Sequence, residues 1–151
     1  MLHLVRTTSE NLDFLALVRL LDQYLAELDG SEHAFYAQFN KTAFLQHVVV
    51  AYLDDQPVGC GAFKEYAPDV VEIKRMYVQP EHRQQGIARA VLGELEKWAA
   101  ELGYATTVLE TGKRQPEAIA LYQRAGYTLT PNYGQYVGIE NSVCLRKELV
   151  G

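Results

Sequence analysis

The chain has 151 residues, of which 48% are hydrophobic and 22% charged, a size and composition typical of one folded domain spanning residues 1–151 and not of a disordered protein. Its formal net charge of −5 argues against a general nucleic-acid binder, because such proteins gather positive charge on one surface. No apolar run approaches the roughly 20 residues that cross a bilayer, and the first residues lack the apolar stretch of a secretory signal, so we expect a cytoplasmic protein with no membrane partner.

An N-terminal strand and two helices are predicted before residue 40. Residues 2–6 have a short strand pattern, and Thr7 or Ser9 can cap the helix that follows. Apolar side chains then recur every three or four residues up to Gly30, which indicates the buried face of an amphipathic helix. These side chains are Leu15, Val18, Leu21, Leu25 and Leu28. A shorter helix is predicted over residues 31–39.

The middle of the chain changes to β-branched runs that are separated by turn residues. Residues 47–53, 58–66 and 70–78 each have the composition of a strand. Because the turns between them are short, we expect these three strands to form an antiparallel meander.

Helix and strand patterns alternate through the rest of the chain. We predict a helix over residues 84–102, a strand over 105–110, a helix over 116–125 and strands over 127–130 and 142–149. The element order is therefore β-α-α-β-β-β-α-β-α-β-β. This order predicts an α/β fold with a mixed central β-sheet and helices on both of its faces.

The junction between the strand at 70–78 and the next helix is the most informative stretch. The strand runs into a basic, glycine-containing loop that is also a helix N-terminus. Such a terminus binds anions, because its first N–H groups lack partners and lie at the positive end of the helix dipole. Gly86 lets a phosphate approach the backbone, and Arg83 and Arg89 add positive charge. The alternative is a helix that merely begins near a glycine and carries solvated arginines.

Two common nucleotide-binding patterns are absent from the sequence. No Gly-x-x-x-x-Gly-Lys-Ser/Thr run exists, and no Gly-x-Gly-x-x-Gly turn opens a helix. The pair Gly59 and Gly61 lies inside a predicted strand with no helix after it. A phosphate-bearing ligand other than a nucleoside triphosphate or NAD is therefore favoured.

The residues of this loop resemble a known family. Residues 83–88, Arg-Gln-Gln-Gly-Ile-Ala, are similar to the Arg/Gln-x-x-Gly-x-Gly/Ala motif of the GNAT N-acetyltransferases, and residues 74–78 match the strand before that motif. Residues 118–127 resemble the family's Ala-x-x-x-Tyr-x-x-x-Gly-Phe/Tyr segment. The resemblance covers roughly residues 47–130. It implies an acetyl-CoA-dependent acyltransferase that moves the acetyl group directly to an amine, with no metal.

The resemblance also implies which residues bind acetyl-CoA. The strand backbone at Met76, Tyr77 and Val78 would pair with the pantetheine amides, as an added β-strand does. Amides of the loop and first helical turn would receive the pyrophosphate: Arg83, Gln84, Gln85, Gly86, Ile87, Ala88 and Arg89. Gln115 stands where the family often has an asparagine that contacts the pantetheine arm. Because glutamine is longer, that contact is open.

Two residues have catalytic roles by the same resemblance. Tyr122 corresponds to the tyrosine whose hydroxyl faces the coenzyme sulfur, and a phenol with a pKa of about 10 can protonate a departing thiolate. Its alternative role is core packing. Glu72 resembles the family's glutamate base, which removes a proton from the amine, and its alternative is an exposed carboxylate or an ion pair with Lys74. Glu110 is the second candidate for the base, and water is the third.

The two cysteines, Cys60 and Cys144, are too few for a disulfide framework or a cysteine-based zinc site. We expect both to be small buried apolar side chains in a reducing compartment. No histidine has a metal-binding partner in the sequence, so no metal is expected.

The acceptor amine is expected to bind between the first helices and the late loops, at residues 24–40 and 131–141. These segments hold acidic and aromatic side chains that suit a cation, namely Tyr24, Asp29, Glu32, Phe35 and Tyr36, with the loop tyrosines closing over them. The charge distribution agrees with this prediction. Residues 1–70 carry four basic and ten acidic side chains, net −6, and residues 71–151 carry ten and nine, net +1.

Three alternatives stay open at this point. The acceptor can be a small-molecule amine, such as a polyamine-like compound or an amino acid, or an amine of a peptide or protein. The protein can be a monomer or a homodimer. It can also be a non-catalytic module that binds and senses acyl-CoA, which would need neither Glu72 nor Tyr122.

Overall fold

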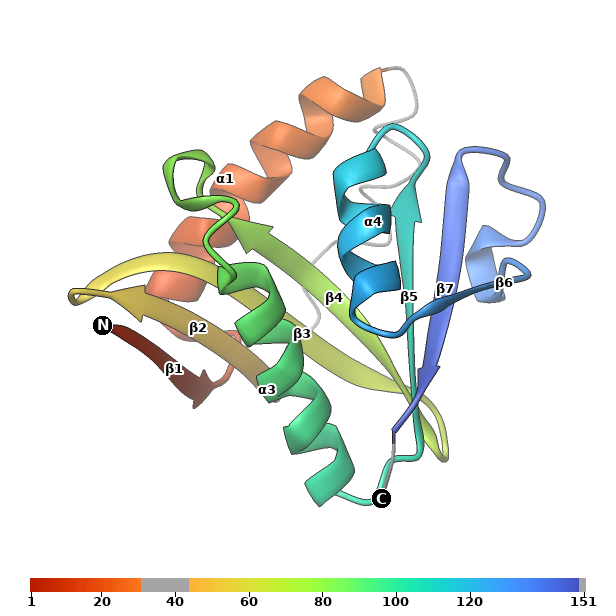
Figure 1. Cartoon of the computed structure of the whole chain (residues 1–151), viewed down its shortest axis with the longest axis horizontal. Coiled ribbons are helices and arrows are strands. Elements are labelled where there is room, and N and C mark those ends of the chain that lie inside the picture. The colour runs from red at the N-terminus through yellow and green to blue at the C-terminus, as the bar shows by residue number, and fades with distance from the viewer. Residues whose placement is uncertain (31–43, 150–151) are drawn as a thin grey trace. The chain divides into compact units, whose positions relative to one another are not determined.

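The computed structural model describes residues 1–30 and 44–149 (Figure 1). They fall into two compact units, and we call residues 1–64 and 74–95 unit 1 and residues 65–73 and 96–151 unit 2. The strands hydrogen-bond in the order β1-β2-β3-β4-β5-β7-β6, in one mixed sheet. This confirms the predicted α/β class. The helix predicted over residues 31–39 lies outside the described residues.

Unit 1 begins with three strands that pair side by side. β1 (Leu2–Thr7) pairs antiparallel with β2 (His47–Leu53), which pairs antiparallel with β3 (Gln56–Ala67). β4 (Val70–Val78) is the next neighbour of β3. β2 and β4 have the bounds that the β-branched runs predict.

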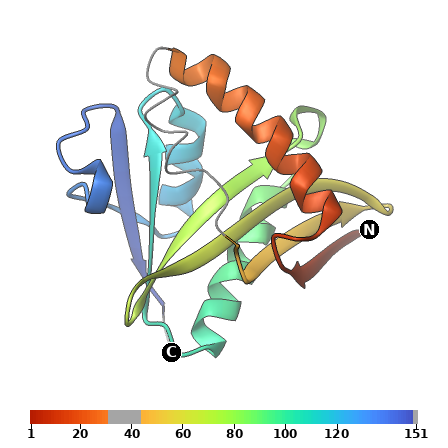
Figure 2. The same ribbon diagram turned by 180° about the vertical axis from the view of Figure 1, so that it is seen from behind.

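Two helices cover opposite faces of the strands of unit 1, as Figures 1 and 2 show from the two sides. α1 (Leu12–Asp29) packs on the face that contains Cys60 and Ala62. It buries Phe14, Leu17, Val18 and Leu21 against that face. This burial of apolar surface is what holds α1 in place, because helices are stabilised mainly by packing of one face.

Details of α1 differ from the sequence prediction. The helix is capped by Asn11, whose side chain accepts a hydrogen bond from the Phe14 amide at 2.9 Å, and not by Thr7 or Ser9. The Ser9 hydroxyl instead accepts from the Leu45 amide at 2.8 Å. Leu15 is exposed, because the buried face is rotated toward Phe14 and Leu17.

α3 (Ile87–Glu101) lies on the other face and begins three residues after the predicted start. It approaches β3 closely at two glycines. A Cβ atom on Gly61 would lie 2.5 Å from the Met76 sulfur and 2.9 Å from Leu95, and one on Gly59 would lie 3.1 Å from Ile87. Gly59 therefore sets how near Ile87, the first residue of α3, comes to β3, and Gly61 does the same for Leu95 farther along the helix.

Unit 2 contains the other strands and the last helix. β5 (Thr106–Gly112) pairs antiparallel with β7 (Ser142–Glu148), which also pairs with β6 (Thr128–Thr130). α4 (Pro116–Arg124) follows β5, and Figure 1 shows it in front of that strand. Short 3-10 turns over Pro80–His82 in unit 1 and Gly134–Tyr136 in unit 2 were not predicted.

The register of unit 2 decides which side chains share a face. β4 pairs in parallel with β5 over three residue pairs that end at Glu72 and Val108. Glu110 is two residues after Val108 and pairs with Cys144 on β7. Because paired residues and residues two apart point to the same side of a sheet, Glu72, Glu110 and Cys144 lie on one face.

Both cysteines are buried free thiols, as predicted. No helix within residues 1–30 and 44–149 is long and apolar enough to cross a membrane. In the same part of the chain, no three His, Cys, Asp or Glu side chains are grouped so that they could hold a metal ion.

Candidate active site

The loop between β4 and α3 is an open helix N-terminus. Residues 83–86 are exposed, and Gln84 and Gly86 have left-handed φ angles of 63° and 81°. A Cβ atom on Gly86 would meet nothing within 4 Å, so the space above it is open. The Ala90 amide makes the first helical hydrogen bond, to the Gly86 carbonyl at 3.0 Å. Earlier amides of a helix have no such partner and suit an anion.

The side chain of Arg83 is held against the end of β4. Its Nε donates to the Val78 carbonyl at 2.9 Å. Its guanidinium lies 5.3 Å from the ring centroid of Tyr24 and 5.7 Å from that of Tyr77, within cation–π range. Tyr24 therefore contacts Arg83, although the sequence placed it in the acceptor surface. The Val78 carbonyl, predicted to pair with pantetheine, is also engaged by Arg83.

The other predicted coenzyme residues belong to both units. Met76, Tyr77 and Val78 lie in the part of β4 that belongs to unit 1 and that follows the last residue pair with β5. Gln115 lies in unit 2, at the position before α4, where its side chain makes no capping hydrogen bond.

Tyr122 is a buried residue of α4. It is 7% exposed, and its ring contacts the Tyr127 ring edge-on with centroids 6.0 Å apart. Burial first, and then the charge of Glu110, raises the pKa of Tyr122. The phenol therefore keeps its proton throughout the neutral range. A group in this state donates a hydrogen bond to a developing thiolate but gives up its proton less readily than a free phenol.

Glu72 is the most buried carboxylate of the candidate site. It is 3% exposed, and it accepts a hydrogen bond from the Tyr133 hydroxyl at 2.7 Å. Among the described residues it forms no ion pair, so neither of the alternative readings, surface carboxylate or partner of Lys74, describes it. A buried carboxylate that no cation compensates is unusual, because burial of a charge is costly.

A group of tyrosines surrounds this carboxylate. The Tyr133 ring contacts Tyr66 and Tyr136 edge-on, with centroids 5.0 Å and 5.8 Å apart. Burial raises the pKa of Tyr133, and the charge of Glu72 raises it further. Burial also raises the pKa of Tyr136, to which the charges of Glu110 and Glu72 both contribute. We call Glu72, Glu110, Tyr133, Tyr136 and Cys144 the carboxylate–tyrosine cluster.

Glu110 links this cluster to the predicted acid. Its charge raises the pKa of Tyr122 as well as that of Tyr136. Unit 2 thus brings together Tyr122 and both candidates for the base. Burial, with contributions from Glu110 and Glu72, raises the pKa of Cys144 to about 11, so this thiol is protonated at neutral pH and is a poor nucleophile.

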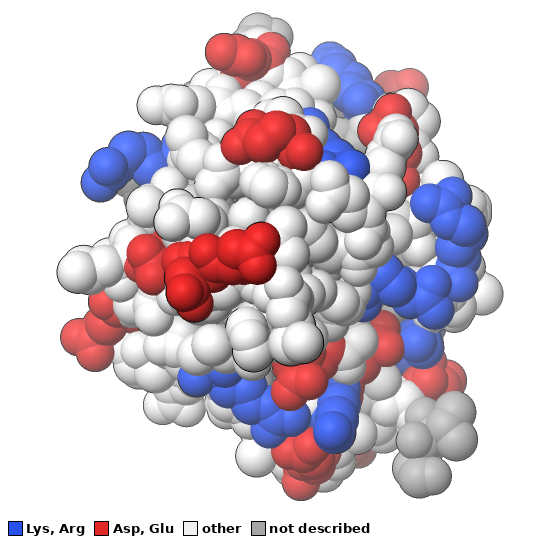
Figure 3. All heavy atoms as spheres, turned by 60° about the vertical axis from the view of Figure 1, so that its left-hand side comes forward, with Lys and Arg blue, Asp and Glu red and all other residues white. Residues whose placement is uncertain are grey.

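Sequence reasoning missed the contact between Tyr133 and Glu72, which are 61 positions apart. The signal present was the Tyr-rich loop before β7, which the sequence placed only near the acceptor. Of the predicted acceptor residues, Glu32, Phe35 and Tyr36 lie outside the described residues. Figure 3 shows both acidic and basic side chains on one face of the molecule, with the two kinds next to one another along its lower edge.

The sequence matches the profile of the acetyltransferase (GNAT) family over residues 14–127. The chain belongs to the GNAT acetyltransferases. It is therefore an acyltransferase, and the loop motif and the segment around Tyr122 both lie inside the matched region.

Relatives of this acetyltransferase match over most of the chain. An IAA acetyltransferase from Azospirillum brasilense is 33% identical over 135 residues, which cover 88% of each chain. A crystal structure of a Klebsiella pneumoniae protein described as an acyl-CoA N-acyltransferase is 30% identical, covers 99% of each chain and has a TM-score of 0.83. The fold is also that of yncA from Salmonella typhimurium, with a TM-score of 0.71, 17% identity and coverage of 100% of this chain and 95% of that one.

Proposed function

We propose that this acetyltransferase uses acetyl-CoA and transfers its acetyl group directly to an amine, with Glu72 as the base and Tyr122 as the group that faces the leaving sulfur. The observation that carries this proposal is the buried carboxylate of Glu72, which accepts a hydrogen bond from Tyr133 and forms no ion pair with any residue among 1–30 and 44–149. A module that only binds acyl-CoA has no use for such a costly group, whereas a catalyst of amine acetylation needs a proton acceptor.

Coenzyme binding is assigned to unit 1. The loop and first helical turn over residues 83–89 suit the pyrophosphate, because they lie at the N-terminal, positive end of the α3 dipole and the space above Gly86 is open. Backbone groups of Met76, Tyr77 and Val78 lie beyond the last residue pair with β5 and suit the pantetheine amides. The yncA structure contains its cofactor acetyl-CoA, which agrees with this choice of coenzyme.

The chemical step is assigned to unit 2. An ammonium acceptor loses a proton to Glu72, directly or through water, and its nitrogen attacks the thioester carbonyl. The carbon–sulfur bond then breaks while the Tyr122 hydroxyl donates a hydrogen bond to the departing thiolate, and the nitrogen loses its second proton, which leaves coenzyme A as the thiol. The products are the N-acetyl amine and coenzyme A, and no acetyl-enzyme forms. The hydroxyl of Tyr133 holds one oxygen of Glu72 and leaves the other for the proton.

The proposal also includes predictions about the domain, the acceptor, the location and the oligomeric state of the protein. Residues 1–151 act as one N-acetyltransferase domain, because β3 and β4 each contribute to both units. The acceptor is an amine of a small molecule or of a peptide. The protein is cytoplasmic and works without a metal. It acts as a monomer or as a homodimer.

The test is a broad amine screen with acetyl-CoA and release of the free thiol as the readout, made with the wild type, Glu72→Gln and Glu110→Gln. We expect Glu72→Gln to lower the rate at neutral pH by about 10²–10⁴-fold, with partial recovery at high pH where free amine is abundant. Glu110→Gln should cost much less.

Calorimetry of acetyl-CoA binding is the control, because neither substitution touches the loop of unit 1. If Glu72→Gln retains full activity while Glu110→Gln abolishes it, the base is Glu110 on β5 and not Glu72 on β4. If the wild type binds acetyl-CoA and acetylates no amine, the proposed transfer to an amine is wrong, and the alternative of a module that only binds acyl-CoA is favoured.

A further inference from the structure

The side chain of Arg83 is held in one place although the residue is exposed. Its Nε donates to the Val78 carbonyl at 2.9 Å. Its guanidinium also lies within cation–π range of two rings, 5.3 Å from the centroid of Tyr24 and 5.7 Å from that of Tyr77. A carbonyl and two aromatic rings have no net charge, so these three contacts orient the guanidinium without neutralising it. All four residues belong to unit 1.

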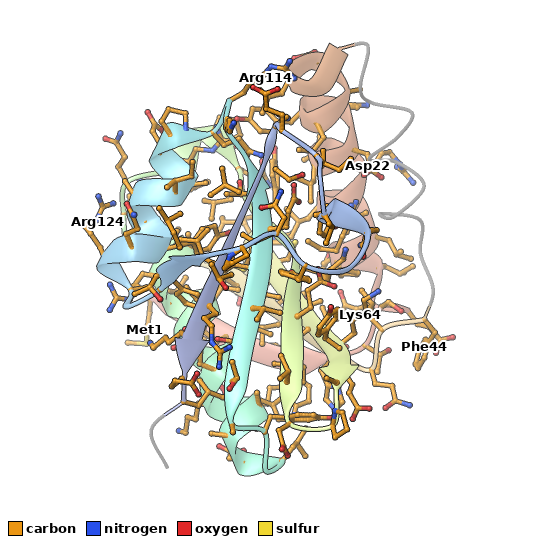
Figure 4. All side chains as sticks on the ribbon, turned by 90° about the vertical axis from the view of Figure 1, so that its right-hand side faces the viewer. Met1, Asp22, Phe44, Lys64, Arg114 and Arg124 are labelled. Carbon is orange, nitrogen blue, oxygen red and sulfur yellow. The ribbon has the colours of Figure 1, made fainter. Side chains whose placement is uncertain are left out.

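Tyr24 is fixed against β4 by the packing of α1. Its ring packs on the apolar core beneath that helix. Two residues earlier on α1, Asp22, which Figure 4 labels, accepts a hydrogen bond from Nη2 of the buried Arg75 on β4 at 2.5 Å. The ion pair and the core contact hold the same turn of α1 against the strand. The Tyr24 ring therefore stays beside Arg83.

The charge of Arg83 lies where the strand passes into the loop. Val78 is the last residue of β4, and Arg83 opens the loop over residues 83–86. The proposed path of the coenzyme runs from the strand backbone to this loop, and so it passes the Arg83 guanidinium. A carbonyl oxygen can accept two hydrogen bonds, so the bond from Arg83 leaves Val78 able to bind pantetheine. A guanidinium keeps its charge and matches phosphate oxygens with its fork of N–H donors.

We propose that Tyr24 is a positioning residue for the acyl donor: its ring holds Arg83 where the guanidinium binds a phosphate of acetyl-CoA. Helix α1 then contributes to coenzyme binding, whereas the sequence assigned Tyr24 to the acceptor. This inference rests on the proposed function, because it requires acetyl-CoA at the loop over residues 83–89. Tyr24 acts here through the face of its ring, so phenylalanine should replace it and an aliphatic side chain should not.

The first test is calorimetry of acetyl-CoA binding with no amine present. Arg83→Gln should raise Kd about tenfold or more, because a hydrogen bond to a charged group is lost. Tyr24→Leu should raise Kd about two- to fivefold, as for a cation–π contact at an exposed site, and Tyr24→Phe should bind like the wild type. The double variant Tyr24→Leu, Arg83→Gln should have the Kd of Arg83→Gln alone, because Tyr24 acts only through Arg83.

Tyr52→Leu is the matched control. Tyr52 packs on the same core as Tyr24, and its hydroxyl donates to Asp13 on α1 at 2.6 Å. Both leucine substitutions should lower the melting temperature, but only Tyr24→Leu should weaken binding of acetyl-CoA. If Tyr52→Leu weakens it as much, or if Tyr24→Leu adds its full effect to that of Arg83→Gln, Tyr24 only supports α1 and the proposal is wrong.

A second acyl donor tests the role of the phosphates. S-acetylpantetheine lacks them, so the preference for acetyl-CoA over this donor in kcat/KM should fall in Tyr24→Leu by about the factor by which Kd rises. A preference equal to that of the wild type would overturn the proposal.

The binding measurement also separates this inference from the proposed function. If the Kd values follow the expected order while no amine is acetylated, the role of Tyr24 stands and the proposed transfer to an amine fails. If amines are acetylated while Tyr24→Leu binds acetyl-CoA as tightly as the wild type, the proposed function stands and Tyr24 does not position Arg83.

Discussion

The two units handle charge in opposite ways. In unit 1 the loop over residues 83–86 offers exposed backbone to an anion, whereas in unit 2 Glu72 and Tyr136 are each 3% exposed. A site that binds an anion through backbone N–H groups needs only a helix N-terminus and open space beside it. A proton acceptor gains from burial, because the chemistry depends on electrostatic interactions that water would weaken. From this difference we expect that one substitution can disrupt coenzyme binding and another can disrupt the chemical step.

After Glu72→Gln, the largest effect in unit 2 is expected from Tyr122→Phe. We expect kcat to fall about 10²-fold or more, because general acid assistance to the leaving thiolate is lost, with little change in acetyl-CoA affinity. Steady-state kinetics and calorimetry check the two halves of this statement. Tyr127→Phe is the control: its hydroxyl bonds to Thr107 and Glu96, so that variant should lose stability and keep its rate per folded molecule.

The matching change in unit 1 is Gly86→Asp. It places a negative charge where the pyrophosphate is proposed to bind, and we expect acetyl-CoA affinity to fall at least about tenfold. Gly86 has a left-handed φ, which asparagine tolerates, so Gly86→Asn tests the side chain without the charge. If calorimetry shows that a folded Gly86→Asp protein binds acetyl-CoA with unchanged affinity, the coenzyme does not bind at this loop.

A smaller effect is expected from Tyr133→Phe, which removes the hydroxyl that holds Glu72. Loss of a hydrogen bond to a charged group is worth roughly 1.5–3 kcal/mol, and we expect kcat to fall about tenfold while the acetyl-CoA Kd stays the same. Tyr66→Phe retains the ring that contacts Tyr133 and should behave like the wild type. Equal rates for both variants would reduce Tyr133 to a packing residue.

The smallest effect concerns stability at high pH. Burial raises the pKa of Tyr122, Tyr127, Tyr133 and Tyr136, all in unit 2. Their contribution to stability is complete below the unfolded pKa of about 10 and is lost as the pH rises above it, by about 1.4 kcal/mol per pH unit for each group. Absorbance of tyrosinate should show these residues ionising only together with unfolding. Ionisation of all ten tyrosines before the far-UV signal changes would contradict their burial.

The fold was predictable because its signals are local. β2 and β4 are β-branched runs between turns, and their ends follow from composition. The start of α3 was placed three residues early, because the spacing of apolar residues does not show that the backbone at Gln84 and Gly86 is left-handed and therefore not helical. Asn11 as the cap of α1 was missed for a similar reason, since Thr7, Ser9 and Asn11 all have capping side chains.

The candidate site was predictable only in part. The loop over residues 83–89 and Tyr122 each lie in a contiguous motif, so a resemblance to the family finds them. The bond between Tyr133 and Glu72 depends on the pairing of β5 with β4 and β7, which no single segment encodes. The same holds for Arg75 and Asp22, which are 53 positions apart and meet only when α1 packs on the sheet.

The most direct test of the account follows an isotopically labelled acetyl group from acetyl-CoA by mass spectrometry of the intact protein and of the amine. Burial raises the pKa of Cys60 to about 12 and that of Cys144 to about 11, so neither thiol is expected to take the acetyl group. The account predicts that the label reaches the amine nitrogen with no labelled protein at any time, and that Glu72→Gln slows this single step. A labelled protein that a later addition of amine discharges, or a label that never leaves acetyl-CoA, would contradict direct transfer.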